Sequence, residues 1–391
     1  MTRFLFVSLP LAGHIDWGGM LATASELTRR PEHAVAWASG PAIAPAIERA
    51  GVEFLDLQRT GWIDPQPVPA GLTTEQLASA RQQRALDAWL HQQRILAAAR
   101  DLEATAANWQ PDVIVAEPYA AAGALVAERI GLPLAVCGRP ALTPQGQLRQ
   151  TGGEATQRIE ALCRDFGVSG DYWDVAAGQI RSRWLHLDFF SRRWYADLPQ
   201  LGQQTRFFGG GGQAGQPRTG RSNTILITLG SLFTNDPAFF RIAAAAVLAE
   251  GGRPRVITGK RGVGATTESL DLPPGTEVTD WVDFDAVLPG AAGIIHHGGV
   301  GTTHAALRHG APQVAVPHAG DQHAQAGRIT LAKVGYGVRP VDFTQTNARW
   351  FAHQLLNSDT LHAVADKWQT DLAWLGGPSA AASALLKVTG P

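Results

Sequence analysis

The chain has 391 residues, of which 45% are hydrophobic and 17% charged, so it predicts two or three domains of about 150 residues and excludes a disordered chain. Lys and Arg total 33 and Asp and Glu total 34, and the net charge of −1 gives no electrostatic reason to expect a nucleic acid or an anionic membrane. Cys137 and Cys163 are too few for a disulfide framework or a four-ligand zinc site; we expect small buried residues in a reducing compartment.

The N-terminal residues share features with a short secretory signal. Arg3 is followed by the apolar run FLFVSLPLAG, but Gly13, His14 and Asp16 interrupt it early. A buried first strand is the preferred interpretation, and a signal peptide is the alternative. Other stretches fall short of the roughly 20 apolar residues of a membrane span. We therefore expect a cytoplasmic protein without an integral membrane segment.

Apolar strands and helices alternate along the first half of the chain. Strands are expected at 3–9, 34–39, 52–57, 112–116 and 133–138. Helices are expected at 18–30, 41–51, 84–108 and 120–131. Continuous apolar strands separated by helices predict parallel βαβ units, and hence an open, doubly wound α/β sheet.

A glycine-rich segment separates this half from a second one. The sequence GGGGQAGQPRTGRSN at 209–223 has no hydrophobic period and is typical of a linker. Strands are then expected at 223–230, 254–259, 276–282, 292–299 and 312–318, and helices at 237–250, 301–309 and 322–334. The predicted domains are 1–208 and 224–391, with the last helix free to pack back on the first domain. We expect them to face each other across a cleft that holds the active site.

The strongest local motif is IIHHGGVGTT at 294–303. A buried strand ends at His296, two glycines allow a tight turn, and Gly301 opens a helix. The free N–H groups and positive dipole end of a helix start suit a diphosphate. The segment TLGS at 228–231 ends another strand and can present Gly230 and Ser231 to the same anion. The alternative is a plain glycine turn with a capping histidine.

Two further features suit a sugar and a base. Asp321 and Gln322 follow a strand and can bind vicinal hydroxyls, although an N-cap role for the aspartate is the common alternative. Trp281 can stack on a flat heterocycle, although packing is the alternative for any one of 12 tryptophans.

Metal sites are not expected. The sequence DFD at 283–285 matches a metal-binding D-x-D, but it follows Trp281 and is common by chance. His304 with His309, and His318 with His323, lack the i, i+4 spacing of a helical zinc pair.

The run from Trp281 through HHGGVGTTHAAL to GDQ at 320–322 resembles the donor-binding signature of family 1 nucleotide-sugar glycosyltransferases, of the bacterial natural-product type. GHI at 13–15 and TLGS at 228–231 support the resemblance. It implies the GT-B fold, with two Rossmann-like domains, in which Trp281 stacks on the base, His297 helps to clamp the diphosphate and Asp321 binds the sugar. The donor-binding residues that it implies are Gly13, Gly230, Ser231, Trp281, Val282, His297, Gly299, Gly301, Thr302, Thr303, Asp321 and Gln322.

The resemblance also places His14 at the position of the family's general base, and an imidazole that titrates near pH 6.5 suits that task. The family's partner of the base is commonly Asp, whereas this chain has Glu117 in VIVAEP. The family usually has Pro soon after the base, whereas this chain has IDWGG. Asp16 and Trp17 therefore enter the expected acceptor region, and Asp16 is the second candidate for orienting His14.

The resulting expectation is an inverting, metal-independent transfer of a hexose to a hydroxyl of a hydrophobic natural product. UDP-sugar members of the family have a glutamate where this chain has Ala305, so a dTDP-sugar is favoured over a UDP-sugar. The acceptor would lie against the segments 60–95 and 139–195. Their aromatic residues are Trp62, Trp89, Tyr172, Trp173, Trp184, Phe189, Phe190, Trp194 and Tyr195.

Two other functions stay open at this point. One is a nucleotide-sugar 2-epimerase of the same fold, and the other is an inactive homologue that serves as a partner protein. No cofactor is expected besides the nucleotide-sugar donor, which is a co-substrate. The protein is expected to be a monomer or a homodimer.

Overall fold

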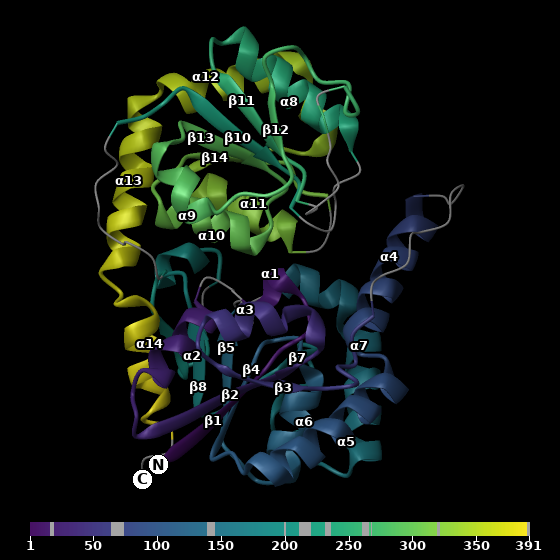
Figure 1. The fold of residues 1–391 in the computed structure, drawn as a ribbon. Coiled ribbons are helices and arrows are strands. Elements are labelled where there is room, and N and C mark those ends of the chain that lie inside the picture. Colours follow the sequence, from purple (N-terminus) through teal and green to yellow (C-terminus); the bar gives the residue numbers. More distant parts are fainter. Residues whose placement is uncertain are drawn as a thin grey trace. The chain divides into compact units, whose positions relative to one another are not determined.

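The computed structural model divides the chain into two compact units. It describes residues 1–15, 19–63, 74–138, 145–198, 201–210, 220–230, 236–259, 266, 268–318 and 321–388. Unit 1 comprises Met1–Asp188, Gln200–Arg206 and Pro378–Pro391, and unit 2 comprises Phe189–Pro199 and Phe207–Gly377. Each unit is a sheet covered by helices (Figure 1).

Unit 1 contains a seven-stranded sheet in the order β3–β2–β1–β4–β5–β8–β9, in which all pairings from β3 to β8 are parallel. Its strands are β1 (Thr2–Val7), β2 (His33–Ser39), β3 (Glu53–Asp56), β4 (Val113–Ala116), β5 (Leu134–Gly138), β8 (Leu185–Asp188) and β9 (Thr205–Phe207). A separate antiparallel ribbon pairs β6 (Trp173–Asp174) with β7 (Gln179–Ile180).

The helices of unit 1 cover this sheet. They are α1 (Ala12–Ile15), α2 (Met20–Thr28), η1 (Pro41–Ile43), α3 (Ala44–Arg49), α4 (Thr74–Trp89), α5 (Gln92–Trp109), α6 (Ala121–Arg129), α7 (Gln145–Phe166) and α14 (Gly377–Leu385). The last helix, α14, lies beside the end of α2 (Figure 1). The Arg30 guanidinium there donates hydrogen bonds to the Ser379 carbonyl and the Ser383 hydroxyl.

Unit 2 contains a six-stranded parallel sheet in the order β12–β11–β10–β13–β14–β15. Its strands are β10 (Thr224–Thr228), β11 (Arg253–Ile257), β12 (Glu277–Thr279), β13 (Gly293–His296), β14 (Gln313–Ala315) and β15 (Gly335–Gly337). Its helices are η2 (Arg192–Tyr195), α8 (Pro237–Ala249), α9 (Phe284–Val287), η3 (Leu288–Gly290), α10 (Val300–Arg308), α11 (Gln322–Leu331), η4 (Pro340–Asp342), α12 (Gln345–Asn357) and α13 (Asp359–Ala373).

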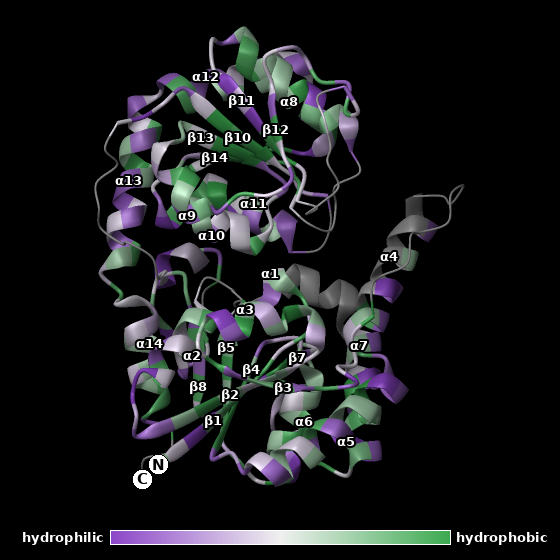
Figure 2. Ribbon diagram, in the orientation of Figure 1, coloured by the Kyte–Doolittle hydropathy of each residue, from purple (hydrophilic) through white to green (hydrophobic). Residues whose placement is uncertain are grey.

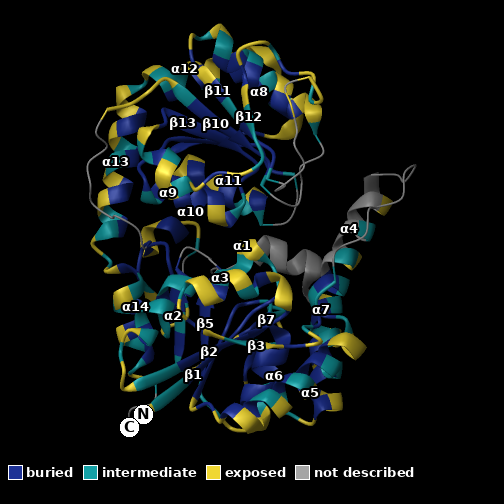
Figure 3. Cartoon of the chain, viewed as in Figure 1, coloured by how far each residue is buried: buried dark blue, intermediate teal, exposed yellow. Residues whose placement is uncertain are grey.

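Both faces of the central strands are buried, which explains why they read as continuous apolar runs. In unit 2, Ile225 and Ile227 pack into one cluster, and Leu226 between them packs into a second cluster. This alternation follows the two-residue period of a strand. Figures 2 and 3 show the consequence, as the strands are predominantly hydrophobic and buried while polar residues gather on the outer helices.

The strand order places a topological switch point in each sheet. Strand β1 lies between β2 and β4 in unit 1, and β10 lies between β11 and β13 in unit 2. Parallel α/β sheets bind ligands beyond the carboxyl ends of the strands at such points. The loops after β1 and β4, and those after β10 and β13, are therefore where side chains should converge.

The expected strands and most expected helices are present with shifted ends. The prediction of one long helix at 84–108 is wrong. The segment is divided between two helices, α4 and α5, because His91 adopts an extended backbone with ψ of 109°. No proline or glycine marks this break, and the apolar period continues across it. The 22-residue helix α7, within the segment 139–195 that was expected to bind the acceptor, was not predicted.

The contact-defined units also differ from the expected domain ranges. The segment 189–199 belongs to unit 2 because its groups find their partners there: the Phe189 carbonyl bonds His304, Trp194 bonds Gln325, and Asp197 forms two bonds with Arg328. Four aromatic residues expected to line an acceptor region of the first domain are thus buried in unit 2: Phe189, Phe190, Trp194 and Tyr195.

The segment 378–391 belongs to unit 1. The central residues 211–219 of the expected linker lie outside the described residues. Among the helices that the structure describes, none combines the length and apolar character needed to cross a membrane.

Candidate functional site

The loops after β1 and β4 bring His14 and Glu117 together in unit 1. His14 lies in α1, and Glu117 follows β4 directly. The Glu117 side chain is fully buried, and its Oε2 lies 2.9 Å from Nδ1 of His14. Its Oε1 accepts a hydrogen bond of 2.7 Å from the Leu9 amide. The Glu117 carboxylate therefore bonds both the backbone after β1, at Leu9, and the His14 imidazole.

This contact determines which form of His14 is favoured. An ionised carboxylate only accepts hydrogen bonds, so Nδ1 of a neutral His14 must carry the proton. The lone pair is then on Nε2, which is the arrangement of an oriented general base. The His14 side chain remains 16% exposed. Asp16, the second candidate for the orienting role, and Trp17 lie outside the described residues.

Aromatic rings surround this imidazole. The ring centroids of His14 and Tyr119 are 5.7 Å apart, and those of His14 and Trp62 are 6.2 Å apart. Trp89 contacts Tyr119 edge to face at 5.1 Å. Sequence reasoning singled out Trp62 and Trp89 but missed Tyr119. Its place two residues after Glu117 was the available signal.

In unit 2, the first histidine of the HH pair has a structural role. His296 is fully buried; its Nδ1 accepts from the Gly298 amide at 3.1 Å, and its Nε2 lies 3.1 Å from the Gln313 side-chain oxygen. Gln313 in turn donates to the Thr303 carbonyl at 3.3 Å. Burial lowers the pKa of His296 to about 3. The neutral ring therefore fixes the turn that precedes α10, a link that the sequence did not reveal.

The second histidine, His297, lies against two glycine turns. A β-carbon at Gly230, where φ is 72°, would be 2.7 Å from this imidazole, and one at Gly299 would be 2.3 Å from it. Both glycines thus leave the space that the ring occupies. Burial lowers the pKa of His297 to about 4, with a further decrease from His318 and an opposing effect of Asp321. The ring is therefore neutral at pH 7.

Unsatisfied polar atoms gather at the start of α10. In the described part of the chain, Nδ1 of His297 and Oγ1 of Thr303 are buried without a hydrogen-bond partner. Thr302 is also buried, whereas nothing lies within 4 Å of where a β-carbon of Gly301 would be. Buried polar groups rarely remain unpaired, so orphaned atoms beside a helix N-terminus point to a bound anion. Ser231 lies outside the described residues.

Asp321 and Gln322 begin α11. The Asp321 side chain forms no capping bond with the helix, so the N-cap alternative for it is not supported. The Gln322 side chain is buried, and its Oε1 accepts from the His318 amide at 2.8 Å. Gln322 therefore also closes the loop that precedes the helix.

Trp281 directly precedes a residue of the apolar cluster that contains Ala305. Trp281 is 51% exposed, and its neighbour Val282 is buried in a cluster that also contains Ala305. The two histidines beside Ala305 have other partners. His304 lies 2.6 Å from the Phe189 carbonyl, and His309 lies 3.0 Å from the Asp285 carboxylate.

Both aspartates of the DFD sequence at 283–285 have hydrogen-bond partners within the protein. Asp283 caps α9 by accepting from the Asp285 amide at 2.9 Å. Asp285 pairs with Arg308 and His309. Burial opposes ionisation of Asp285, but the bond from His309 and the charge of Arg308 outweigh it and lower its pKa to about 2. This carboxylate is thus already bonded to the Arg308 guanidinium and the His309 ring.

The remaining predicted glycine, Gly13, lies in α1 beside His14. Nothing lies within 4 Å of where its β-carbon would be, so a ligand could approach the backbone there.

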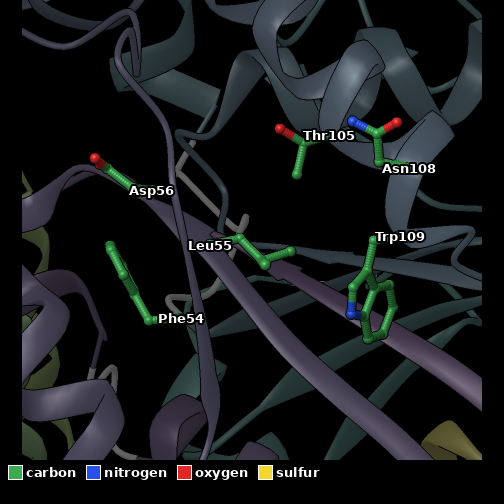
Figure 4. A pocket seen from close by; sticks show the side chains of 6 residues that line it. All are labelled: Phe54, Leu55, Asp56, Thr105, Asn108 and Trp109. Carbon is green, nitrogen blue, oxygen red and sulfur yellow. The ribbon is translucent and has the colours of Figure 1, made fainter.

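A hollow of about 380 Å³ lies apart from these residues, at the sheet edge of unit 1 (Figure 4). Side chains of β3 and α5 line it: Phe54, Leu55, Asp56, Thr105, Asn108 and Trp109. It contains none of the predicted site residues.

Comparisons with known proteins agree with the resemblance. Residues 259–387 match the family model "Erythromycin biosynthesis protein CIII-like, C-terminal domain". The chain is 27% identical over 422 aligned residues to the demethyllactenocin mycarosyltransferase of Streptomyces fradiae, which covers 100% of this chain and 87% of that protein.

Solved structures give the same result for the fold. The glycosyltransferase of kitacinnamycin matches with a TM-score of 0.79 at 23% identity, over 100% of this chain and 99% of that one. The glycosyltransferase VinC, solved in complex with dTDP, matches with a TM-score of 0.71 at 21% identity, over 99% of each chain. These relatives favour a transferase over the epimerase and partner-protein alternatives. The chain is a glycosyltransferase of the GT-B fold, and it is similar to the natural-product glycosyltransferases among these relatives.

Proposed function

We propose that this glycosyltransferase moves a hexose from a nucleoside-diphosphate sugar to a hydroxyl of a hydrophobic small molecule, with inversion and without a metal ion. The observation that carries the proposal is the contact of His14 with the buried Glu117 carboxylate, whose other oxygen accepts a hydrogen bond from the Leu9 amide. It supports one oriented base, which is what a single displacement requires.

In the proposed reaction, the acceptor hydroxyl transfers its proton to Nε2 of His14 while its oxygen attacks the anomeric carbon. The bond from that carbon to the phosphate oxygen breaks, and the nucleoside diphosphate leaves with the electron pair. The anomeric carbon inverts, so an α-linked donor gives a β-linked product. Glu117 stabilises the imidazolium as it forms.

Unit 2 would hold the donor. His297, Thr302 and Thr303 would bind the diphosphate at the positive end of α10, and the orphaned atoms at this position support that role. Trp281 would stack on the base, and Asp321 and Gln322 would bind sugar hydroxyls. The helix and hydrogen-bond donors, rather than a divalent cation, would stabilise the leaving group, so addition of a chelator should leave transfer unchanged.

Substituting the base tests the proposal directly. With dTDP-glucose and the best acceptor from a mass-spectrometric screen, His14→Ala should lower kcat about 100-fold or more, because general-base help contributes at least this factor. The affinity for dTDP should stay unchanged. Glu117→Gln should have a smaller effect, since the geometry survives while the charge is lost.

A matched control is available on the surface of unit 2, where His353 forms an exposed pair with Glu250 at 3.2 Å. His353→Ala should retain full activity. Near-normal turnover of a folded His14→Ala variant, or a screen without any transfer product, would contradict the proposal.

The pKa of His297 predicts how nucleotide binding depends on pH. A cationic imidazole would lose its proton as the pH rises through its pKa, and diphosphate affinity would then decrease. Because the pKa of His297 is about 4, the ring is neutral throughout, and dTDP affinity should be constant from pH 7 to 9. His297→Ala should weaken dTDP binding about tenfold or more at either pH, through loss of a hydrogen bond to a charged group. Calorimetric titration measures both, and an affinity that declines steadily above pH 7 would indicate a cationic ring instead.

Ala305 predicts the nucleotide preference. An alanine offers no acceptor to a ribose 2′-hydroxyl, and His304 and His309 are bonded elsewhere, so nothing at this position favours a ribose over a deoxyribose. The dTDP complex of VinC supports the same choice. We expect dTDP to bind at least as tightly as UDP in calorimetric titration. Ala305→Glu should shift the preference toward UDP, whereas Ala305→Leu, which adds bulk without an acceptor, should not. UDP binding clearly tighter than dTDP by the unmodified protein would refute this expectation.

A further inference from the structure

The turn after β4 holds the His14 imidazole in two ways. Within the sequence Glu-Pro-Tyr at 117–119, Glu117 bonds the edge of the ring at Nδ1. Tyr119, two residues later, lies against the ring with centroids 5.7 Å apart and planes tilted by 39°. One short turn thus supplies both a polar and an aromatic contact to the same side chain.

Tyr119 is itself held in place. Trp89, the last residue of α4, meets the Tyr119 ring edge to face, with centroids 5.1 Å apart and planes at 76°. This is a favourable geometry for an aromatic pair. A second ring, Trp62, contacts His14 at 6.2 Å with planes tilted by 55°. All of these residues belong to unit 1.

A hydrogen bond at Nδ1 alone does not fix the plane of an imidazole, because the terminal torsion of a histidine side chain has a broad energy minimum. A ring packed against the imidazole restricts this torsion. An aromatic ring within about 6 Å of a cation also stabilises its charge. In the proposed reaction the imidazole gains a positive charge as it removes the acceptor proton, so this second contribution acts in the transition state.

We propose that Tyr119, supported by Trp89, is a positioning residue that orients His14 and stabilises its imidazolium during transfer. The inference rests on the proposed role of His14 as the general base. It assigns the effect to the aromatic ring of Tyr119 and not to its hydroxyl.

The test compares two substitutions at this position in the full-length enzyme, with dTDP-glucose and the screened acceptor. Tyr119→Leu should lower kcat about tenfold, equivalent to about 1.4 kcal/mol in the activation barrier, while the KM for dTDP-glucose stays unchanged. Tyr119→Phe keeps the ring and should retain kcat within about twofold. Tyr336→Leu removes a tyrosine from a comparable edge-to-face pair with Trp350 in unit 2, at 5.0 Å, and should leave kcat unchanged.

A double variant separates positioning from a general structural effect. In a His14→Ala background, Tyr119→Leu should cause no further loss, because its effect acts through the imidazole. A further tenfold loss in that background, a loss in Tyr119→Phe as large as in Tyr119→Leu, or a change confined to the acceptor KM would overturn the inference. If His14→Ala itself is fully active, the proposed function fails; if it is inactive while Tyr119→Leu is normal, only the positioning role fails.

Discussion

The buried carboxylate of Glu117 is the constraint on which the site of unit 1 depends. A charge removed from water is tolerated only when hydrogen bonds replace the lost hydration. Here the Leu9 amide binds one oxygen and His14 binds the other. Both partners come from the loop after β1, while the carboxylate comes from the end of β4, so the adjacency of these two strands brings the three groups together. The order of the strands in the sheet therefore determines which carboxylate contacts the imidazole.

In unit 2 the buried histidines of the candidate site are neutral. His296 and His297 are neighbours in sequence, yet one ring bonds the turn and Gln313 while the other retains an unpaired nitrogen beside α10. Burial keeps both pKa values well below neutrality. In the proposed donor site, the start of α10 would contribute dipoles and hydrogen-bond donors to the diphosphate, without a fixed positive charge in a site that must be stable when empty. Asp285, which is bonded to Arg308 and His309, lies outside this set of donors.

The sequence was sufficient to predict strands β1 to β5 and β10 to β14, because buried parallel strands and glycine turns leave strong local signals. It did not predict β8, β9 or β15, which complete the two sheets. It was insufficient for the break between α4 and α5, since His91 departs from helical geometry without a proline or glycine. It also misassigned Phe189 and Trp194, whose apolar character predicts burial but not which unit provides it. The roles of Leu9 and Gln313 depend on a backbone amide and a side-chain amide that only the folded chain brings to Glu117 and His296, respectively.

At Glu117 this chain differs from the aspartate that is usual in the family it resembles. A glutamate is one methylene longer than the usual aspartate and has one more torsion to restrict before it can orient an imidazole. The bond from the Leu9 amide to Oε1 fixes that torsion, so Oε2 remains at 2.9 Å from Nδ1 of His14. The aromatic contacts of Tyr119 and Trp62 then limit the remaining tilt of the ring. In the proposed mechanism, a longer carboxylate can therefore orient the same imidazole, because the surrounding turn restores the rigidity that the extra methylene removes.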